Sequence, residues 1–315
     1  MPNISQALLK AQSHGLDRLD AQLLLLHALG HPTHDRAWLL AHDTDALPPT
    51  LQATFDACVQ RRTAGEPLAY ITGHKEFFGL DLQVDARVLV PRPDTETLVE
   101  WALEVMAEMP HASIIDLGTG SGAIALALKH TRPDLRVNAI DASADALHVA
   151  QANAQRLQLQ VEFTQGSWLT TVGGRYHAIV SNPPYIAAQD RHLNNLTHEP
   201  LQALASGDDG LDDIRKIVTQ GRAYLHPGGW LLLEHGYEQA GPVRDLLLDA
   251  GFEDVQSKPD LSGIERCSGG RAPPSMPSRR GPNHTAIQLV RNLGVAASRI
   301  DSDASLICIF TGWKA

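Results

Sequence analysis

The first part of the chain has a helical pattern of hydrophobic and polar residues. Apolar side chains are concentrated in three segments, namely residues 21–29, 36–41 and 51–62. The tripeptides Gly30-His31-Pro32 and Leu47-Pro48-Pro49 separate these segments, since glycine and proline interrupt helices. The pattern predicts a small bundle of four or five helices between Ile4 and about Gly65.

The pattern changes twice before residue 112. Hydrophobic and polar residues alternate from Phe77 to Val90, which favours a β-hairpin. The acidic segment Pro91–Glu96 follows, and its prolines would stiffen the entry to a helix that we expect from Thr97 to Glu108. Thr95 or Asp94 would then lie near the helix cap.

From residue 112 onward, short apolar runs alternate with helical segments. The runs that we predict to be strands are Ser113–Leu117, Arg136–Asp141, Gln160–Thr164, His177–Ser181, Gly229–Glu234 and Phe252–Ser257. The helices expected among them cover residues 122–129, a segment that ends at Arg156, residues 212–225 and residues 241–250. This alternation is typical of an α/β fold with a mostly parallel sheet.

The composition excludes several classes of protein. Hydrophobic residues make up 43% of the chain, yet no apolar run approaches the ~20 residues that span a bilayer, and residues 1–5 do not resemble a signal peptide. Three scattered cysteines, Cys58, Cys267 and Cys308, indicate a reducing cytoplasm. The net charge of −10 argues against broad binding of nucleic acid through its phosphates. His31 and His34 lie in a predicted turn, and we expect no metal site.

The most informative motif is Asn182-Pro183-Pro184-Tyr185, which directly follows the predicted strand His177–Ser181. The two prolines end that strand, because neither can donate a backbone hydrogen bond. The Asn182 side chain is therefore held at the carboxyl end of a strand, where open α/β sheets bind ligands. Its oxygen and a backbone carbonyl would suit the two N–H groups of one planar amino group, and Tyr185 would stack on that plane. A strand end with a structural proline turn is the alternative.

A second motif, Gly118-Thr119-Gly120-Ser121-Gly122, follows Asp116 and the end of a predicted strand. Glycines allow a tight turn close to a ligand, and the start of the next helix offers free N–H groups. Asp141 ends the next predicted strand, where a carboxylate can hold both hydroxyls of a ribose. NAD and S-adenosylmethionine both fit this arrangement, and a purely structural turn also stays open.

Together, these elements resemble the class I, Rossmann-like methyltransferases, which use S-adenosylmethionine. Within that class, the Asn-Pro-Pro-Tyr motif is similar to that of enzymes that methylate adenine, cytosine or a glutamine amide. Three further segments, Glu66–Gly73, Val90–Glu96 and Ser206–Leu211, resemble the PrmC/HemK family. Its members methylate the glutamine of peptide chain release factors. The resemblance covers about residues 5–271.

The resemblance implies a set of site residues. The cofactor would be bound by Gly118, Thr119, Gly120, Ser121, Gly122, Asp141, Trp168 and Asn182. The catalytic residues would be Asn182, Pro183 and Tyr185, and with Pro184 they would form the glutamine pocket. Taken alone, Trp168 is better interpreted as a core aromatic. Pro91–Glu96 would wall the methionine end of the cofactor, and a structural loop is nearly as good an interpretation. Glu234 and His235 would end a strand without a catalytic role.

The implied partner is a release factor whose Gly-Gly-Gln turn enters the pocket while the helical part provides the docking surface. We expect no direct nucleic acid binding, no membrane association and a monomer. Two alternatives stay open. A DNA or RNA amino-methyltransferase acting on adenine N6 or cytosine N4 would share the Asn-Pro-Pro-Tyr motif, but the sequence shows no basic stripe or inserted recognition domain. A non-enzymatic scaffold is the second alternative, and it is disfavoured because a scaffold would not need the complete set of pocket residues that this sequence contains.

We expect four parts in the chain: a helical domain at residues 1–75, a hairpin linker at 76–96, a methyltransferase domain at 97–271 and an extension at 272–315. Relatives carry a strand of the type Arg-Val-Thr-Leu-Gly-Arg near their end. Here Arg266–Arg271 contains two glycines, which weaken a strand and put it in doubt. Residues 272–284 are rich in Pro, Ser and Arg and are expected to be disordered, whereas Leu306–Phe310 would form a strand or a sticky apolar segment.

Overall fold

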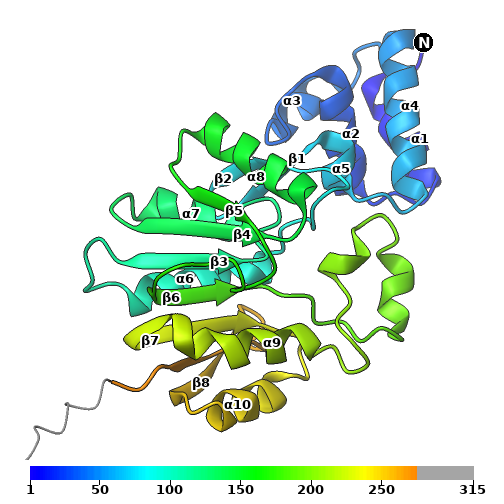
Figure 1. Ribbon diagram of the computed structural model, residues 1–315. Helices are drawn as coiled ribbons and strands as arrows, with labels where there is room; N and C mark the ends of the chain where they lie inside the picture. Colours follow the sequence, from blue (N-terminus) through cyan, green and yellow to red (C-terminus); the bar gives the residue numbers. More distant parts are fainter. Residues whose placement is uncertain (275–315) are drawn as a thin grey trace, which may run out of the picture. The chain divides into compact units, whose positions relative to one another are not determined.

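The computed structural model describes residues 1–274, and its first elements are helices (Figure 1). They are α1 (Ile4–Ser13), α2 (Arg18–Leu29), α3 (Arg36–Ala41), α4 (Pro49–Thr63) and α5 (Leu68–Thr72). Asn3 begins α1 with a capping box, since its side chain accepts from the Gln6 backbone and the Gln6 side chain accepts in return from the Asn3 backbone. Gly30 ends α2 in the left-handed conformation. The predicted helical bundle is confirmed, and it has its own core around Leu25 and Phe55.

The hairpin that follows lies earlier than the alternating pattern indicated. Its strands are β1 (His74–Phe77) and β2 (Leu80–Gln83). Phe78 and Gly79 form the turn with φ angles of 50° and 77°, as a two-residue type I′ turn requires. The prediction placed Phe77 at the start, but it ends the first strand. The apolar residues Val88 and Val90 are buried in the main core without belonging to a strand.

The predicted α/β fold is confirmed. Its sheet contains β3 (Ser113–Leu117), β4 (Arg136–Asp141), β5 (Glu162–Gln165), β6 (Tyr176–Ser181), β7 (Leu225–Glu234), β8 (Glu253–Pro259) and β9 (Glu265–Arg271). The strand order is β5-β4-β3-β6-β7-β9-β8. The first five strands are parallel, and β9 runs antiparallel to both of its neighbours. The order reverses between β3 and β6, which is where folds of this kind bind ligands.

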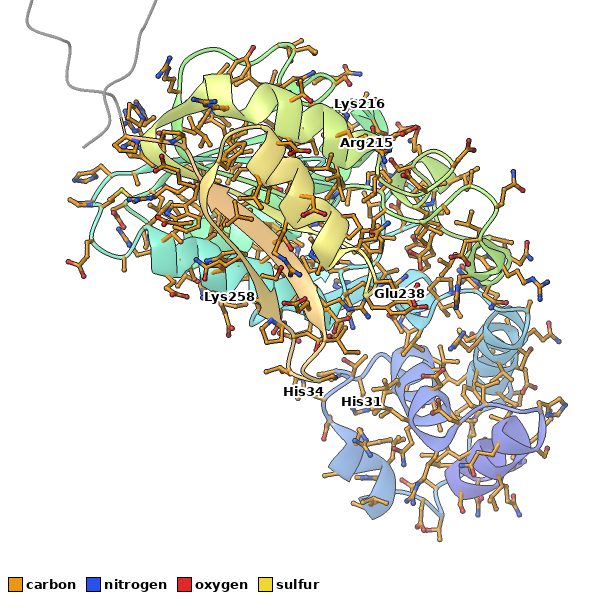
Figure 2. The ribbon with its side chains drawn as sticks, turned by 90° about the horizontal axis from the view of Figure 1, so that it is seen from below. His31, His34, Arg215, Lys216, Glu238 and Lys258 are labelled. Carbon is orange, nitrogen blue, oxygen red and sulfur yellow. The ribbon has the colours of Figure 1, made fainter. Side chains whose placement is uncertain are left out.

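Helices cover both faces of the sheet. They are α6 (Glu96–Val105), α7 (Ala123–Thr131), α8 (Ala144–Leu157), α9 (Asp212–Gly221) and α10 (Ala240–Asp249). Buried residues of α6, α7 and α8 share one core cluster, and those of α9 and α10 share another. Figure 2 shows α9 with Arg215 and Lys216 labelled and β8 with Lys258 labelled. None of the helices in residues 1–274 is long and apolar enough to cross a membrane.

The doubt about the last strand was wrong. Residues Glu265–Arg271 form β9, which lies between β7 and β8. A Cβ atom at Gly269 would lie 2.6 Å from Leu232 Cδ2, and one at Gly270 would lie 2.8 Å from Phe252 Cβ. The two glycines therefore allow close packing instead of weakening the strand.

The sheet also extends beyond the predicted end of the methyltransferase domain. Ala272 is buried, its N–H donates to the Gly229 carbonyl over 2.7 Å, and its carbonyl accepts from the Gly228 N–H over 3.0 Å. This residue therefore belongs to the fold and does not begin a disordered segment. The predictions for residues 275–315, including Leu306–Phe310, lie outside the part of the chain that the structure describes.

Candidate active site

A cavity of about 280 Å³ lies at the carboxyl ends of β3, β4 and β6. Six residues that the sequence singled out line it: Gly118, Gly120, Asp141, Trp168, Asn182 and Pro184. They come from four separate segments of the chain, and the parallel strands bring them to one edge of the sheet. Thr119, Ser121, Gly122, Pro183 and Tyr185 do not line this cavity.

The glycine-rich loop after β3 turns tightly against its surroundings. Gly118, Gly120 and Gly122 have φ angles of 71°, 56° and 85°, which favour glycine. A Cβ atom at Gly122 would lie 3.2 Å from Ala150 Cβ, so this glycine allows α7 and α8 to approach each other. The hydroxyl of the buried Thr119 donates to Asp116 Oδ2 over 2.6 Å. Thr119 and Gly122 therefore support the loop, while Gly118 and Gly120 border the cavity.

Asp141 joins the glycine-rich loop to the end of β4. Its Oδ2 accepts from the Gly120 N–H and its Oδ1 accepts from the Ser143 N–H, both over 2.9 Å. Burial raises the pKa of Asp141, and the backbone N–H groups, which stabilise the carboxylate, oppose that rise. Each carboxylate oxygen can accept more than one hydrogen bond. Asp141 therefore holds the loop and still presents acceptors to the cavity that it lines.

Trp168 forms one wall of the cavity in a strained conformation. Its φ is 50°, in the left-handed region that a residue other than glycine rarely adopts. The edge of its indole lies against Gly118, since a Cβ atom there would be 3.4 Å from Trp168 Cζ3. Its indole N–H donates to Asp213 Oδ1 over 3.3 Å. Trp168 is thus a cavity residue, and it also packs against the second core cluster.

Asn182 lies where two cavities meet. It lines the large cavity and also a smaller one of about 90 Å³, which Arg92 and Tyr185 line as well. Its Nδ2 donates to Thr95 Oγ1 over 3.2 Å, and its Oδ1 is buried without a partner among the described residues. A buried acceptor without a partner costs free energy, so Asn182 Oδ1 is ready to receive a donor.

Tyr185 is held at its far end by a buried acid. Its hydroxyl donates to Glu234 Oε1 over 3.4 Å, and Glu234 Oε2 has no partner in the described part of the chain. Burial raises the pKa of Glu234 to about 7, while the Thr95 hydroxyl and the Arg266 guanidinium act to lower it. Burial also raises the pKa of Tyr185, which keeps its hydroxyl neutral. The sequence interpretation of Glu234 as a strand end missed this contact.

The segment Pro91–Glu96 contributes Arg92 and Thr95 to the site, through contacts that the sequence did not predict. Arg92 Nη2 donates to both carboxylate oxygens of Glu199, over 2.6 and 2.9 Å. The Glu199 side chain is only 3% exposed, so this ion pair connects the segment to the chain that follows Tyr185. Thr95 is buried beside Asn182. The expected wall at the methionine end of a cofactor stays a prediction.

No group of three or more His, Cys, Asp or Glu side chains in residues 1–274 has an arrangement that could hold a metal ion. The fold and the cavity at the strand ends define a class I methyltransferase. In agreement, residues 95–257 match the family described as "Methyltransferase small domain". The hMettl16 catalytic domain, solved in complex with a MAT2A 3′UTR hairpin, has the same fold. Its TM-score is 0.53 at 15% identity, over 72% of this chain and 83% of that one.

The particular family follows from two further comparisons. Residues 4–73 match the family described as "PrmC N-terminal domain". The release factor glutamine methyltransferase of Burkholderia pseudomallei (strain K96243) is 46% identical over 282 residues, which cover 86% of this chain and 97% of that protein. The protein of the same name from Escherichia coli (strain K12) is 43% identical over 85% of this chain and 97% of its own length. The chain belongs to the release factor glutamine methyltransferase family.

Proposed function

We propose that this chain transfers a methyl group from S-adenosylmethionine to the side-chain amide nitrogen of the glutamine in the Gly-Gly-Gln motif of peptide chain release factors. This reaction would modulate translation termination. The observation that carries the proposal is Asn182 Oδ1, a buried acceptor without a described partner at the junction of two cavities. One cavity would hold the methyl donor, and the other would hold the glutamine.

The large cavity suits an adenosyl group. Gly118 and Gly120 leave space for close approach to the backbone, and a side chain on Gly118 would meet the Trp168 ring. Asp141 offers carboxylate oxygens to ribose hydroxyls, and Trp168 offers an aromatic wall to adenine. Thr119, Ser121 and Gly122 would act by shaping the loop. When bound, S-adenosylmethionine supplies a methyl group that its sulfonium already activates.

The small cavity suits a planar carboxamide. Asn182 Oδ1 and the Pro183 carbonyl would each accept one N–H of the glutamine amide, which would aim the nitrogen lone pair toward the large cavity. These acceptors also stabilise the positive charge that develops on the nitrogen during transfer. Pro184, which lines the large cavity next to Asn182, would shape the boundary between the two cavities. Tyr185, whose hydroxyl binds Glu234, would fix the plane of the amide. No strong general base is required, because the methylated nitrogen loses its proton easily.

The remaining parts of the chain fit a protein substrate. The helical domain at residues 1–75 would dock the release factor, the linker at 76–96 would connect it, and the domain from residue 97 would perform the transfer. Release factors act at the ribosome, which agrees with the cytoplasmic location predicted from the scattered cysteines. The monomeric state stays a prediction.

The alternative of a DNA or RNA amino-methyltransferase is not favoured. The relatives named release factor glutamine methyltransferase match over nearly their whole length, including the helical part. The net charge of −10 is also unfavourable for a phosphate backbone. The likeness to the hMettl16 domain, at 15% identity, concerns the fold alone.

The decisive experiment offers a methyl-labelled donor to three acceptors side by side: a purified release factor, its Gly-Gly-Gln variant with Gln→Ala, and duplex DNA. We expect label in the unmodified release factor only. Label in DNA, or equal label in the Gln→Ala factor, would contradict the proposal.

A further inference from the structure

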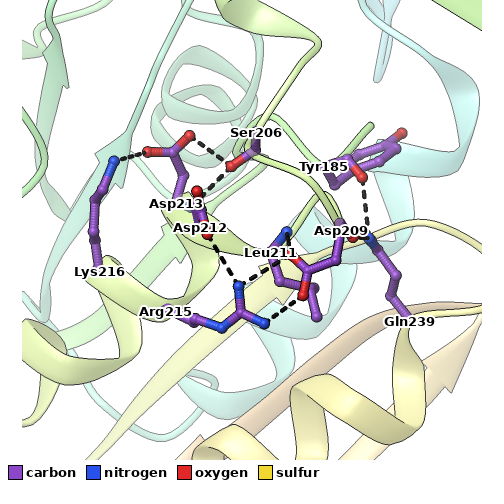
Figure 3. A network of polar contacts seen from close by, with 9 residues as sticks. All are labelled: Tyr185, Ser206, Asp209, Leu211, Asp212, Asp213, Arg215, Lys216 and Gln239. Carbon is purple, nitrogen blue, oxygen red and sulfur yellow. Dashed lines mark hydrogen bonds and ion pairs between the residues drawn. The ribbon is translucent and has the colours of Figure 1, made fainter. Parts of the chain in front are cut away.

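Polar contacts connect the segment Ser206–Leu211 to Asp213 through the Ser206 hydroxyl and to Gln239 through the Asp209 carbonyl (Figure 3). We propose that Asp213 and Gln239 are positioning residues that act with this segment. Asp213 fixes the Trp168 wall of the large cavity, and Gln239 fixes the backbone of Tyr185 beside the small one. This inference rests on the proposed function for the roles of the two cavities.

Asp213 itself lines the large cavity, and both of its carboxylate oxygens have partners within the chain. Its Oδ1 accepts from the Trp168 indole N–H over 3.3 Å and from Lys216 Nζ over 2.9 Å. Its Oδ2 accepts from the Ser206 hydroxyl over 2.7 Å, and that hydroxyl accepts in turn from the Asp213 N–H over 2.9 Å. The Asp213 side chain is only 17% exposed. A carboxylate held from three sides keeps the indole in one orientation, as a strained residue such as Trp168 requires.

Gln239 holds the backbone of Tyr185 beside the small cavity, as Asp213 holds the Trp168 indole beside the large one. Its Nε2 donates to the Tyr185 carbonyl over 3.0 Å and to the Asp209 carbonyl over 3.2 Å, while its Oε1 accepts from the Gly236 N–H over 2.8 Å. Every hydrogen of that amide nitrogen therefore has a partner. The side chain connects the Tyr185 backbone to the segment Ser206–Leu211 through two carbonyl groups.

Gly210 explains how closely the segment approaches Tyr185. A Cβ atom at Gly210 would lie 2.2 Å from the Tyr185 carbonyl oxygen, and the φ of Gly210 is 77°. No side chain fits this position without displacing the Tyr185 backbone. Arg215 fixes the same turn from outside, since its guanidinium binds the carboxylates of Asp209 and Asp212. The segment is thus rigid at the point where it supports the small cavity.

The two positioning residues predict two separable effects, because each acts on a different wall. Loss of the Asp213 contact would loosen Trp168 and weaken cofactor binding. Loss of the Gln239 contact would displace Tyr185 and slow methyl transfer. A residue that only stabilised the fold would change both properties together.

The Asp213 arm measures the Kd for S-adenosylmethionine by calorimetry on the full-length protein. We expect Asp213→Ala to raise that Kd at least fivefold, and Asp213→Asn, which keeps one acceptor oxygen, to raise it less. In a Trp168→Phe background, which lacks the indole N–H, Asp213→Ala should change the Kd less than twofold. Asp245→Ala is the control, because Asp245 is exposed on α10 and has no side-chain hydrogen bond or ion pair among the described residues.

The Gln239 arm uses Gln239→Glu, which replaces the donor by an oxygen facing two carbonyls. We expect at least a tenfold lower kcat with release factor and a Kd for S-adenosylmethionine within twofold of wild type. Hydrogen exchange should increase at residues 185–188 and stay unchanged at residues 118–122. The matched control is Glu238→Gln at the exposed neighbouring position.

Each arm has an outcome that overturns the proposal. An equal effect of Asp213→Ala with and without the Trp168 indole would mean that Asp213 does not act through Trp168. If Gln239→Glu changed the Kd and kcat by equal factors, or left hydrogen exchange at residues 185–188 unchanged, Gln239 would not be a positioning residue for Tyr185. The calorimetry and the exchange measurements need no methyl acceptor. If wild type bound the cofactor but did not methylate release factor, the proposed function would be wrong. The calorimetry and the hydrogen exchange would still test the roles of Asp213 and Gln239.

Discussion

The side-chain nitrogen of Asn182 donates to the hydroxyl of Thr95 over 3.2 Å, across 87 residues of sequence. This contact fixes which end of the Asn182 amide faces Thr95. The oxygen is thereby left as the buried acceptor without a partner in the described chain. Thr95 is itself buried, so the orientation of Asn182 is set by a contact that excludes water.

The first prediction concerns this contact. Thr95→Val keeps the shape of the side chain but removes the hydroxyl, so Asn182 would lose its orientation. A hydrogen bond of this kind contributes about 0.5–1.5 kcal/mol, which corresponds to a loss in kcat of up to about tenfold. Steady-state kinetics with release factor would measure this loss, with Thr97→Val in the adjoining helix α6 as the control. An unchanged kcat would show that Asn182 needs no fixed partner.

The second prediction concerns Asn182 directly. Asn182→Ala removes the acceptor that would receive the glutamine amide, so turnover should fall below detection. The affinity for S-adenosylmethionine should fall only modestly, because Gly118, Asp141 and Trp168 still line the large cavity. Single-turnover kinetics and calorimetry would separate these two effects. Substantial remaining turnover would be incompatible with the role assigned to Asn182.

The third prediction concerns the cofactor. Asp141→Ala should weaken S-adenosylmethionine binding by about 1.5–3 kcal/mol, the range for hydrogen bonds to a charged group. NAD should not bind measurably to wild type. Calorimetry would test both statements, with the exposed Asp145→Ala as the control on the following helix. Tight NAD binding without S-adenosylmethionine binding would overturn the cofactor assignment.

The fourth prediction concerns the pH dependence of stability at Glu234. Its pKa is about 7 in the folded chain, against an ordinary value of 4.5. The folded state therefore binds the proton more tightly than the unfolded state does. Relative to Glu234→Gln, the free energy of unfolding of wild type should fall by roughly 3 kcal/mol as the pH rises from about 4.5 to about 7.

Urea unfolding of both proteins at pH 4.5 and pH 8 would measure this difference. The exposed Glu100→Gln is the control, because the Glu100 side chain lies in solvent in the folded chain as well. A stability difference between wild type and Glu234→Gln that is the same at both pH values would show that Glu234 titrates normally.

The fifth prediction concerns the end of the fold. A chain that ends at Pro274 should keep the methyl-transfer rate within about threefold, because every residue of the two cavities precedes it. A chain that ends at Arg271 loses the two backbone hydrogen bonds of Ala272 and should be less stable by about 1–3 kcal/mol. Thermal melting and activity of both truncated chains would decide this. Equal stability would show that Ala272 contributes nothing to the sheet.

The sequence by itself determined the features that depend on neighbouring residues. The glycine-rich loop, the acid that ends β4 and the Asn-Pro-Pro-Tyr turn each follow an apolar strand, so their chemistry could be recognised from local order. The alternation of strands and helices predicted the α/β class for the same reason. Hydrophobic periodicity and turn chemistry act over a few residues, and parallel strands then bring their carboxyl ends to one edge of the sheet.

Only the tertiary structure decided the contacts between distant segments. Three sets of contacts join parts of the chain that are far apart in the sequence, and no local pattern predicts them. They are Thr95 with Asn182, Glu234 with Tyr185, and the contacts at the two ends of the segment Ser206–Leu211. The strand β9 is a further case that local sequence could not predict. Its glycines are unfavourable by local propensity, but packing against Leu232 and Phe252 requires them. Burial and close approach outweigh propensity there, and both arise only once the whole sheet is assembled.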